Sequence, residues 1–211
     1  MKLTRGSAGD VRKKIVSRAD AIFLMIASGL AALVTTAATL SGTVALLSGP
    51  VTLVLPVATS PQRATDLALE ATGHFMSMEA TIPVLPSGPA ANLAWAGVLN
   101  QVGILTVLAL VFLLAYRLQS RILFTATSAH IVGAAGAVLA VSGTLGQVLD
   151  GVGRSRLAEM IGANARVPGE SHFFFSANFN LGPLMLGIVL LLVAGVFEYG
   201  RALQKDTEGL V

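Results

Sequence analysis

The sequence predicts an all-α integral membrane protein built as a bundle of four transmembrane helices. The 211-residue chain is 54% hydrophobic and only 12% charged, whereas ordinary soluble domains carry about 25% charged residues. The charges also cluster, which leaves long segments without Asp, Glu, Lys or Arg at 21–48, 94–116, 128–149 and 181–197, of which the third contains His130. Because a helix needs roughly 20 apolar residues to cross a hydrocarbon core of about 30 Å, each segment predicts one span.

We expect the four helices over about 20–48, 94–118, 127–149 and 181–203, in a single membrane domain that covers residues 1–211. The fourth span becomes long enough because its charged end, 198–203, can reach the membrane interface. The first neutral segment follows a basic start, as in a signal peptide. It is nearly twice as long as the about 7–15 apolar residues of such peptides, so we interpret it as a retained helix.

Lysine and arginine are distributed unevenly over the predicted loops and termini. With the N-terminus inside, the cytoplasmic segments carry ten of them, and the two outer loops, at about 49–93 and 150–180, carry four. Positive residues favour the cytoplasmic side of a membrane, so we expect both termini in the cytoplasm. The formal net charge of +3 then reflects this topology, and direct nucleic-acid binding is not expected.

The two outer loops contain patterns that predict a small strand-containing extracytoplasmic cap. In the first loop, 50–61 is rich in β-branched residues and prolines, which favours an edge strand. The segment 80–89 is expected to be a second extended piece, and 64–78 has the apolar spacing of a short helix. In the second loop, we expect a short helix at 154–161. Later in the same loop, Phe173, Phe175 and Phe179 alternate with polar residues, as in a strand with one apolar face.

A stripe of small residues runs along the third predicted helix. Its members recur at spacings of three and four residues, which places them on one helix face: Ala129, Gly133, Gly136, Ala140 and Gly143. Membrane helices pack through small residues because lipid tails are as apolar as leucine, so that close backbone approach holds the helices together. The stripe predicts an intramolecular packing seam, with a contact between two copies of the chain as the alternative.

Asn100, Gln101 and His130 are candidate functional residues within the predicted spans, where burial of polar groups is costly. Asn100 and Gln101 could line a solute path, but interhelical hydrogen bonds are the favoured interpretation. His130, near the cytoplasmic start of the third helix, could ligate haem or a metal. A local hydrogen bond is favoured for it, because His74 and His172 both fall in the outer loops and cannot supply a second ligand at its depth.

The remaining sequence offers little that would support catalysis. Asp150 and Arg154, and likewise Arg156 and Glu159, are spaced to form ion pairs where the third helix leaves the membrane. No nucleophile motif, phosphate-binding loop or histidine-rich metal spacing occurs. The chain has no cysteine, which excludes disulfides, thiolate metal sites and thiol nucleophiles. We therefore expect no catalytic residue, no metal and no cofactor.

The C-terminal segment from Phe175 reads FSANFNLGPLMLGIVLLLVAGVFEYGRALQKDTEGLV. It resembles the bacterial membrane family catalogued as domain of unknown function 2975. The resemblance covers roughly the last 37 residues and rests on a phenylalanine-x-x-glycine-x-x-leucine turn at Phe197, Gly200 and Leu203, followed by an acidic tail. It implies a four-helix protein of the bacterial plasma membrane, often encoded beside small helix-turn-helix regulators. It supplies no catalytic residues.

The tail itself has two interpretations. Its cationic residues suit the last turns of a helix, where the backbone carbonyls accumulate negative potential. Beyond them the tail becomes acidic and ends in Gly-Leu-Val, which allows either a solvated helix end or a docking peptide for a cytoplasmic partner. The residues of this possible interaction tail are Arg201, Lys205, Asp206, Glu208, Leu210 and Val211.

Together these observations predict a non-enzymatic membrane protein that acts through protein–protein contacts. It would regulate or sense for a small cytoplasmic helix-turn-helix protein, or serve as an accessory subunit of a larger membrane complex. The expected partners are the lipid bilayer and a membrane or cytoplasmic protein, including a second copy of the chain. A small oligomeric channel or transporter is the alternative, and a membrane enzyme or haem protein is the third hypothesis.

The predicted topology is open to a direct test. Reporter fusions placed at residue 211 and within 60–63 should report opposite sides of the membrane, with the C-terminal fusion in the cytoplasm, because the positive residues cluster there. A C-terminal reporter that is active only outside the cell would overturn the assignment.

Overall fold

The structure is a computed structural model that describes residues 18–56, 63–64, 73–74, 77–119, 126–162 and 179–208. Its helices are α1 (Arg18–Ser48), α2 (Ser87–Gln119), α3 (Ala126–Met160) and α4 (Gly182–Glu208). Two longer strands, β1 (Val51–Pro56) and β4 (Ser77–Ile82), accompany the short β2 (Arg63–Ala64) and β3 (Gly73–His74). All four helices are long and apolar enough to cross a membrane, which confirms the prediction of four such spans.

Two helices are longer than the sequence predicted. α2 begins at Ser87 rather than near 94, where the carbonyl of Pro86 accepts the first helical hydrogen bond from the N–H of Ala90 at 3.0 Å. Pro89 is tolerated there because the N–H groups of a first turn have no helical partner. α3 continues to Met160, so the separate short helix predicted over 154–161 is in fact its last part. Gly162, with φ of 76°, then ends the helix in a left-handed conformation.

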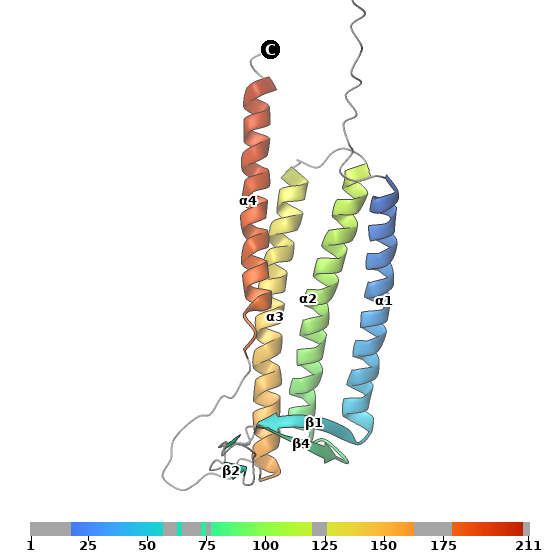
Figure 1. Cartoon of the computed structure of the whole chain (residues 1–211), viewed down its shortest axis with the longest axis vertical. Helices are drawn as coiled ribbons and strands as arrows, with labels where there is room; N and C mark the ends of the chain where they lie inside the picture. Colours follow the sequence, from blue (N-terminus) through green and yellow to red (C-terminus); the bar gives the residue numbers. More distant parts are fainter. Residues whose placement is uncertain are drawn as a thin grey trace, which may run out of the picture.

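The four helices form an open row and not the bundle that was predicted. α1 packs on α2, α2 on α3 and α3 on α4, and α1 and α4 lie at the two ends of the row (Figure 1). Successive helices run in opposite directions, so α2 and α3 are antiparallel neighbours. The row leaves many large apolar side chains of α1 and α4 exposed. A bilayer would cover such side chains at no hydrophobic cost.

Exposed aromatic residues mark two levels along the row. Trp95 and Tyr116 are both exposed on α2, and 21 residues separate them, which corresponds to about 32 Å at 1.5 Å per residue. Phe179, just before α4, and Tyr199 within it are exposed as well. They are separated by the part of α4 between Gly182 and Tyr199, about 26 Å long, and by the three residues that precede Gly182. The separation on α2 matches a hydrocarbon core of about 30 Å, and aromatic residues favour its two interfaces.

β1 and β4 form an antiparallel two-stranded sheet that lies across one end of the helix row (Figure 1). We call it the cap sheet, the adjacent helix ends the cap end, and the opposite ends, where α4 finishes, the tail end. The strand at the start of the first loop is thus confirmed, and the second extended piece is confirmed up to Ile82. The helix predicted over 64–78 is wrong, because 64, 73–74 and 77–78 belong to strands. Pairing with β1, from Val51 opposite Ile82 to Pro56 opposite Ser77, overrides the local apolar spacing.

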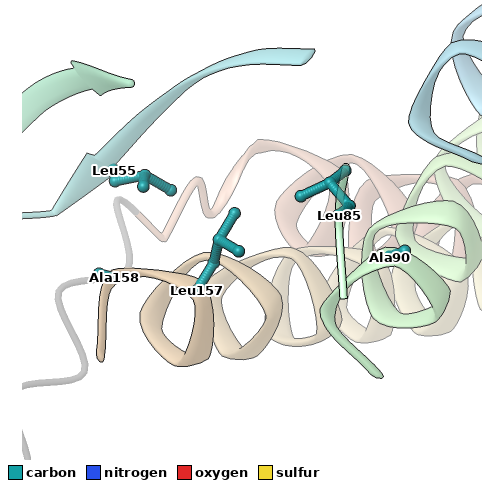
Figure 2. Packing of buried hydrophobic residues seen from close by; sticks show 5 residues of the cluster. All are labelled: Leu55, Leu85, Ala90, Leu157 and Ala158. Atoms are coloured by element: carbon teal, nitrogen blue, oxygen red, sulfur yellow. The ribbon is translucent and has the colours of Figure 1, made fainter. Parts of the chain in front are cut away.

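One leucine anchors the cap sheet to the helices. Leu55 of β1 is fully buried and points toward Leu157 and Ala158 of α3, with Leu85 and Ala90 beside them (Figure 2). Burial of a leucine side chain is worth about 1.5–3 kcal/mol, whereas an isolated two-stranded sheet is at best marginally stable. The cap sheet therefore depends on this contact with α3.

The phenylalanine-rich strand predicted in the second loop lies outside the described residues, apart from Phe179. That residue is 40% exposed and directly precedes the segment that leads into α4.

Candidate functional site

A cavity of about 820 Å³ lies between the cap sheet and the cap ends of the helices. We call it the cap-end cavity. This volume is within the range of about 300–1,000 Å³ that small-molecule sites occupy. Its lining combines apolar residues of β1 and of all four helix ends with a few polar side chains. The polar residues are Ser77, Asn100, Gln147, Asp150, Arg154 and Asn180.

An ion pair within α3 lies at this cavity, and a hydrogen bond from its arginine joins α3 to the cap sheet. The Nε of Arg154 donates to Oδ2 of Asp150 at 2.7 Å, and its Nη1 donates to the carbonyl of Val54 at 3.0 Å. The predicted pairing of Asp150 with Arg154 is therefore confirmed. Their side chains are 42% and 33% exposed, so the pair adds little stability, about 0.3–0.5 kcal/mol. Its effect is to hold a guanidinium and a carboxylate at fixed positions in the cavity wall.

Gln147 of α3 ties the start of α4 to the same wall. Its Oε1 accepts from the N–H of Asn180 at 2.6 Å, while its Nε2 donates to the carbonyls of Asn180 and Gly143 at 3.0 and 3.1 Å. Oδ1 of Asn180 in turn accepts from the N–H of Gly182 at 2.8 Å, which satisfies a donor in the first turn of α4. Gln147 was not among the residues predicted from the sequence, although a glutamine in an apolar span is a signal that could have identified it.

Four glycines line the cavity. Two of them allow close contacts between helices, and a third leaves open space. A Cβ at Gly143 would collide with the ring of Pro183, and one at Gly146 would meet the carbonyl oxygen of Ala96 at 3.3 Å, so these two allow close helix contacts. A Cβ at Gly97 of α2 would meet nothing within 4 Å. At Gly97 the missing side chain therefore leaves open space in the cavity.

The polar residues predicted within the second span separate into two environments. Asn100 is exposed and lines the cavity. Gln101 is only 6% exposed, and its amide bridges α2 to three threonine hydroxyls of α1, which confirms the interhelical hydrogen bonds favoured for it. It donates to Thr35 at 3.1 Å and to Thr36 at 2.9 Å, and it accepts from Thr39 at 3.1 Å.

His130 lies on α3 close to the tail end and is exposed. It is 13 residues before Gly143, the cavity residue of α3 nearest to it, which corresponds to about 20 Å along the helix. The fold therefore does not bring His130 to the cavity. Within the described part of the chain, no group of three or more His, Cys, Asp or Glu residues is placed to hold a metal ion.

The small-residue stripe of α3 packs against α4, which confirms the intramolecular seam. A Cβ at Gly136 would lie 2.7 Å from the carbonyl oxygen of Gly187, and a Cβ at Gly187 would lie 2.6 Å from the carbonyl oxygen of Gly136. At Gly133 the nearest atom is the Cβ of Ala194, at 3.4 Å. The backbones of α3 and α4 therefore touch, and only glycine fits at the centre of the contact.

The predicted interaction tail is largely helical. α4 continues through Lys205 and Asp206 to Glu208, and it extends beyond the tail ends of the other helices (Figure 1). Arg201 pairs with Glu198 at 3.9 Å, and both side chains are exposed. Leu210 and Val211 lie outside the described residues.

Comparisons of the chain with protein-family models, with curated proteins and with solved structures find no match. The resemblance of the C-terminal segment to a known membrane family therefore remains a prediction based on its tail motif.

The α3–α4 contact predicts a graded effect of side-chain size at Gly136. Substitution Gly136→Ala places a methyl group against backbone atoms of α4 and should destabilise the protein by about 1–3 kcal/mol. Gly136→Leu should cost more, because it separates the two helices. The measurement is thermal unfolding in detergent.

The matched control is Gly195→Leu on α4, where a Cβ would meet nothing within 4 Å. It should unfold at the parental temperature. If Gly136→Leu also unfolds at the parental temperature, the α3–α4 contact is incorrect.

Proposed function

We propose that the protein is a non-enzymatic membrane sensor that binds a ligand in the cap-end cavity and acts on another protein through the tail of α4. The observation that carries this proposal is the course of α4. The helix starts at the cavity wall, where Asn180 and Pro183 line the cavity, and it ends in the segment that extends beyond the other helices at the tail end. One helix thus connects a small-molecule cavity with a surface suited to a protein partner.

The contacts along α4 indicate how a ligand could alter the tail. At the cap end, α4 is tied to α3 by Gln147 and Asn180. Farther along, Gly136 and Gly187 bring the two backbones into contact. Helices in contact typically respond to ligands by shifts of about 1–2 Å. A ligand that displaces Asn180 or Pro183 would shift α4 along this glycine contact and move its tail.

The proposed orientation follows from the distribution of lysine and arginine. The tail end faces the cytoplasm and the cap sheet lies outside the plasma membrane of a bacterial cell. The partner is then a cytoplasmic protein, such as a small helix-turn-helix regulator, and nucleic acid would be reached only through it. An accessory role in a larger membrane complex uses the same tail surface.

The channel or transporter alternative loses one of the residues that motivated it. Gln101 is engaged with three threonine hydroxyls between α1 and α2, so its amide is directed to helix packing. Asn100 belongs to the cap-end cavity, where it supports ligand binding.

A charge reversal in the tail tests the proposal. The variant carries Asp206→Lys together with Glu208→Lys, and the matched control is Glu79→Lys, an exposed residue of the cap sheet. Full-length protein purified from native membranes should retain a cytoplasmic partner with the parent and with the control, but not with the tail variant. The same partner, expressed separately, should bind the reconstituted proteins in the same pattern. Equal retention of every partner by parent and tail variant would contradict the proposal.

A further inference from the structure

We infer that the cap-end cavity binds a zwitterionic amphiphile, whose head carries an anionic oxygen group and an amine and whose body is an apolar chain. This inference rests on the proposed sensing role of the cavity and adds the chemical class of its ligand. It is argued from the depth of the cavity in the membrane, from the charges in its wall and from its open apolar space.

The cavity spans a membrane interface. Trp95 marks the interface at the cap end, and Asn100 lies five residues farther into the hydrocarbon, about 8 Å along α2. Gly146 of α3 packs against α2 at this level, where its Cβ would lie 3.5 Å from the backbone nitrogen of Asn100. Arg154 follows Gly146 by eight residues, about 12 Å in the opposite direction along the membrane normal. The cavity therefore reaches from the headgroup region into the hydrocarbon, which fits a ligand with one polar and one apolar end.

The charges at the polar end are complementary to a zwitterion. A guanidinium has five N–H donors, and Arg154 uses two of them, toward Asp150 and Val54. Its remaining donors form no hydrogen bond to the described residues, and neither does Oδ1 of Asp150. Guanidinium groups favour phosphate and carboxylate oxygens, and the second carboxylate oxygen of Asp150 suits an ammonium group.

The paired charges also disfavour a ligand with a single charge. A simple anion bound by the guanidinium of Arg154 would be repelled by the neighbouring carboxylate of Asp150. A simple cation bound by that carboxylate would be repelled by the guanidinium. A zwitterion satisfies both groups and leaves the site neutral, which matters because an uncompensated charge near hydrocarbon is costly.

The inner part of the cavity provides space for an apolar chain. Ala96 and Pro183 line it, and Gly97 opens it further because a Cβ there would meet nothing within 4 Å.

Two polar side chains lie at this depth. The amide of Gln147 is engaged with Asn180 and Gly143, whereas the amide of Asn100 can donate to the ester or amide carbonyl that joins a head to an acyl chain.

The experiment measures binding to purified full-length protein in a nonionic detergent, by native mass spectrometry and by the shift in thermal unfolding. The probes are palmitoyl lysophosphatidylethanolamine, palmitoyl lysophosphatidylglycerol, monopalmitoylglycerol and free phosphoethanolamine. The first should bind saturably with one molecule per chain, at least tenfold more tightly than each of the others. Equal affinity for the three lipids would show nonspecific lipid association and overturn the inference, as would the absence of saturable binding. Phosphoethanolamine as tight as the lysolipid would overturn the requirement for an apolar chain.

Two variants locate the binding site. Gly97→Phe should fill the cavity and abolish binding, while Gly42→Phe on α1, where a Cβ also meets nothing within 4 Å, should bind as the parent does. Arg154→Gln should weaken binding at least tenfold. Unchanged binding by Gly97→Phe would place the lipid elsewhere and contradict the inference. The assay contains no partner, so lipid binding without partner capture would refute the proposed function alone, and partner capture without lipid binding would refute only this inference.

Discussion

The thickness of the hydrocarbon core is the constraint on which the rest of the structure depends. On α2, the exposed Trp95 and Tyr116 lie about 32 Å apart, close to the separation of the two membrane interfaces. α2 and α3 are 33 and 35 residues long, which makes each of them about 50 Å long, well beyond that thickness. Their excess length at the cap end supports the cap sheet and forms the outer wall of the cavity. At the tail end, the last part of α4 passes the level of Tyr199.

Within that layer, the helices are held together by close backbone contacts and by satisfied polar groups. α3 is central, because it contacts α4 through Gly136 and Gly187 and contacts α2 through Gly146. α1 is attached by a different means, the hydrogen bonds between Gln101 and three threonines. Such bonds are worth about 0.6 kcal/mol each in membrane proteins. The open row therefore has a tightly packed α2–α3–α4 portion and a more weakly held α1.

The sequence could predict the spans and the seam because lipid imposes strong rules on composition. The uncharged segments predicted the position of all four helices. They indicate only the part of each helix that lies in the lipid, so the ends of α2 and α3 outside the membrane were not predicted. The stripe around Gly136 predicted close packing. That its partner is Gly187 could not be predicted, because this pairing depends on how α4 packs back on α3. The arrangement of the helices in an open row could not be predicted, since four apolar spans are equally compatible with a closed bundle. The cavity could not be predicted either, because it combines residues of six elements. At Gly97, moreover, the feature that creates the space is the absence of a side chain.

The depth of Trp95 tests the central claim most directly, since the chain has one tryptophan and its fluorescence can be excited at wavelengths that the two tyrosines do not absorb. The full-length protein is reconstituted in bilayers that contain phosphatidylcholines brominated at different positions along the acyl chain, and quenching is compared among them. Our account predicts the strongest quenching from bromines close to the headgroup, because Trp95 marks the interface at which the cap-end cavity opens. Strongest quenching from bromines near the chain ends, or no quenching by any brominated lipid, would contradict this placement of the helix row and of the cavity.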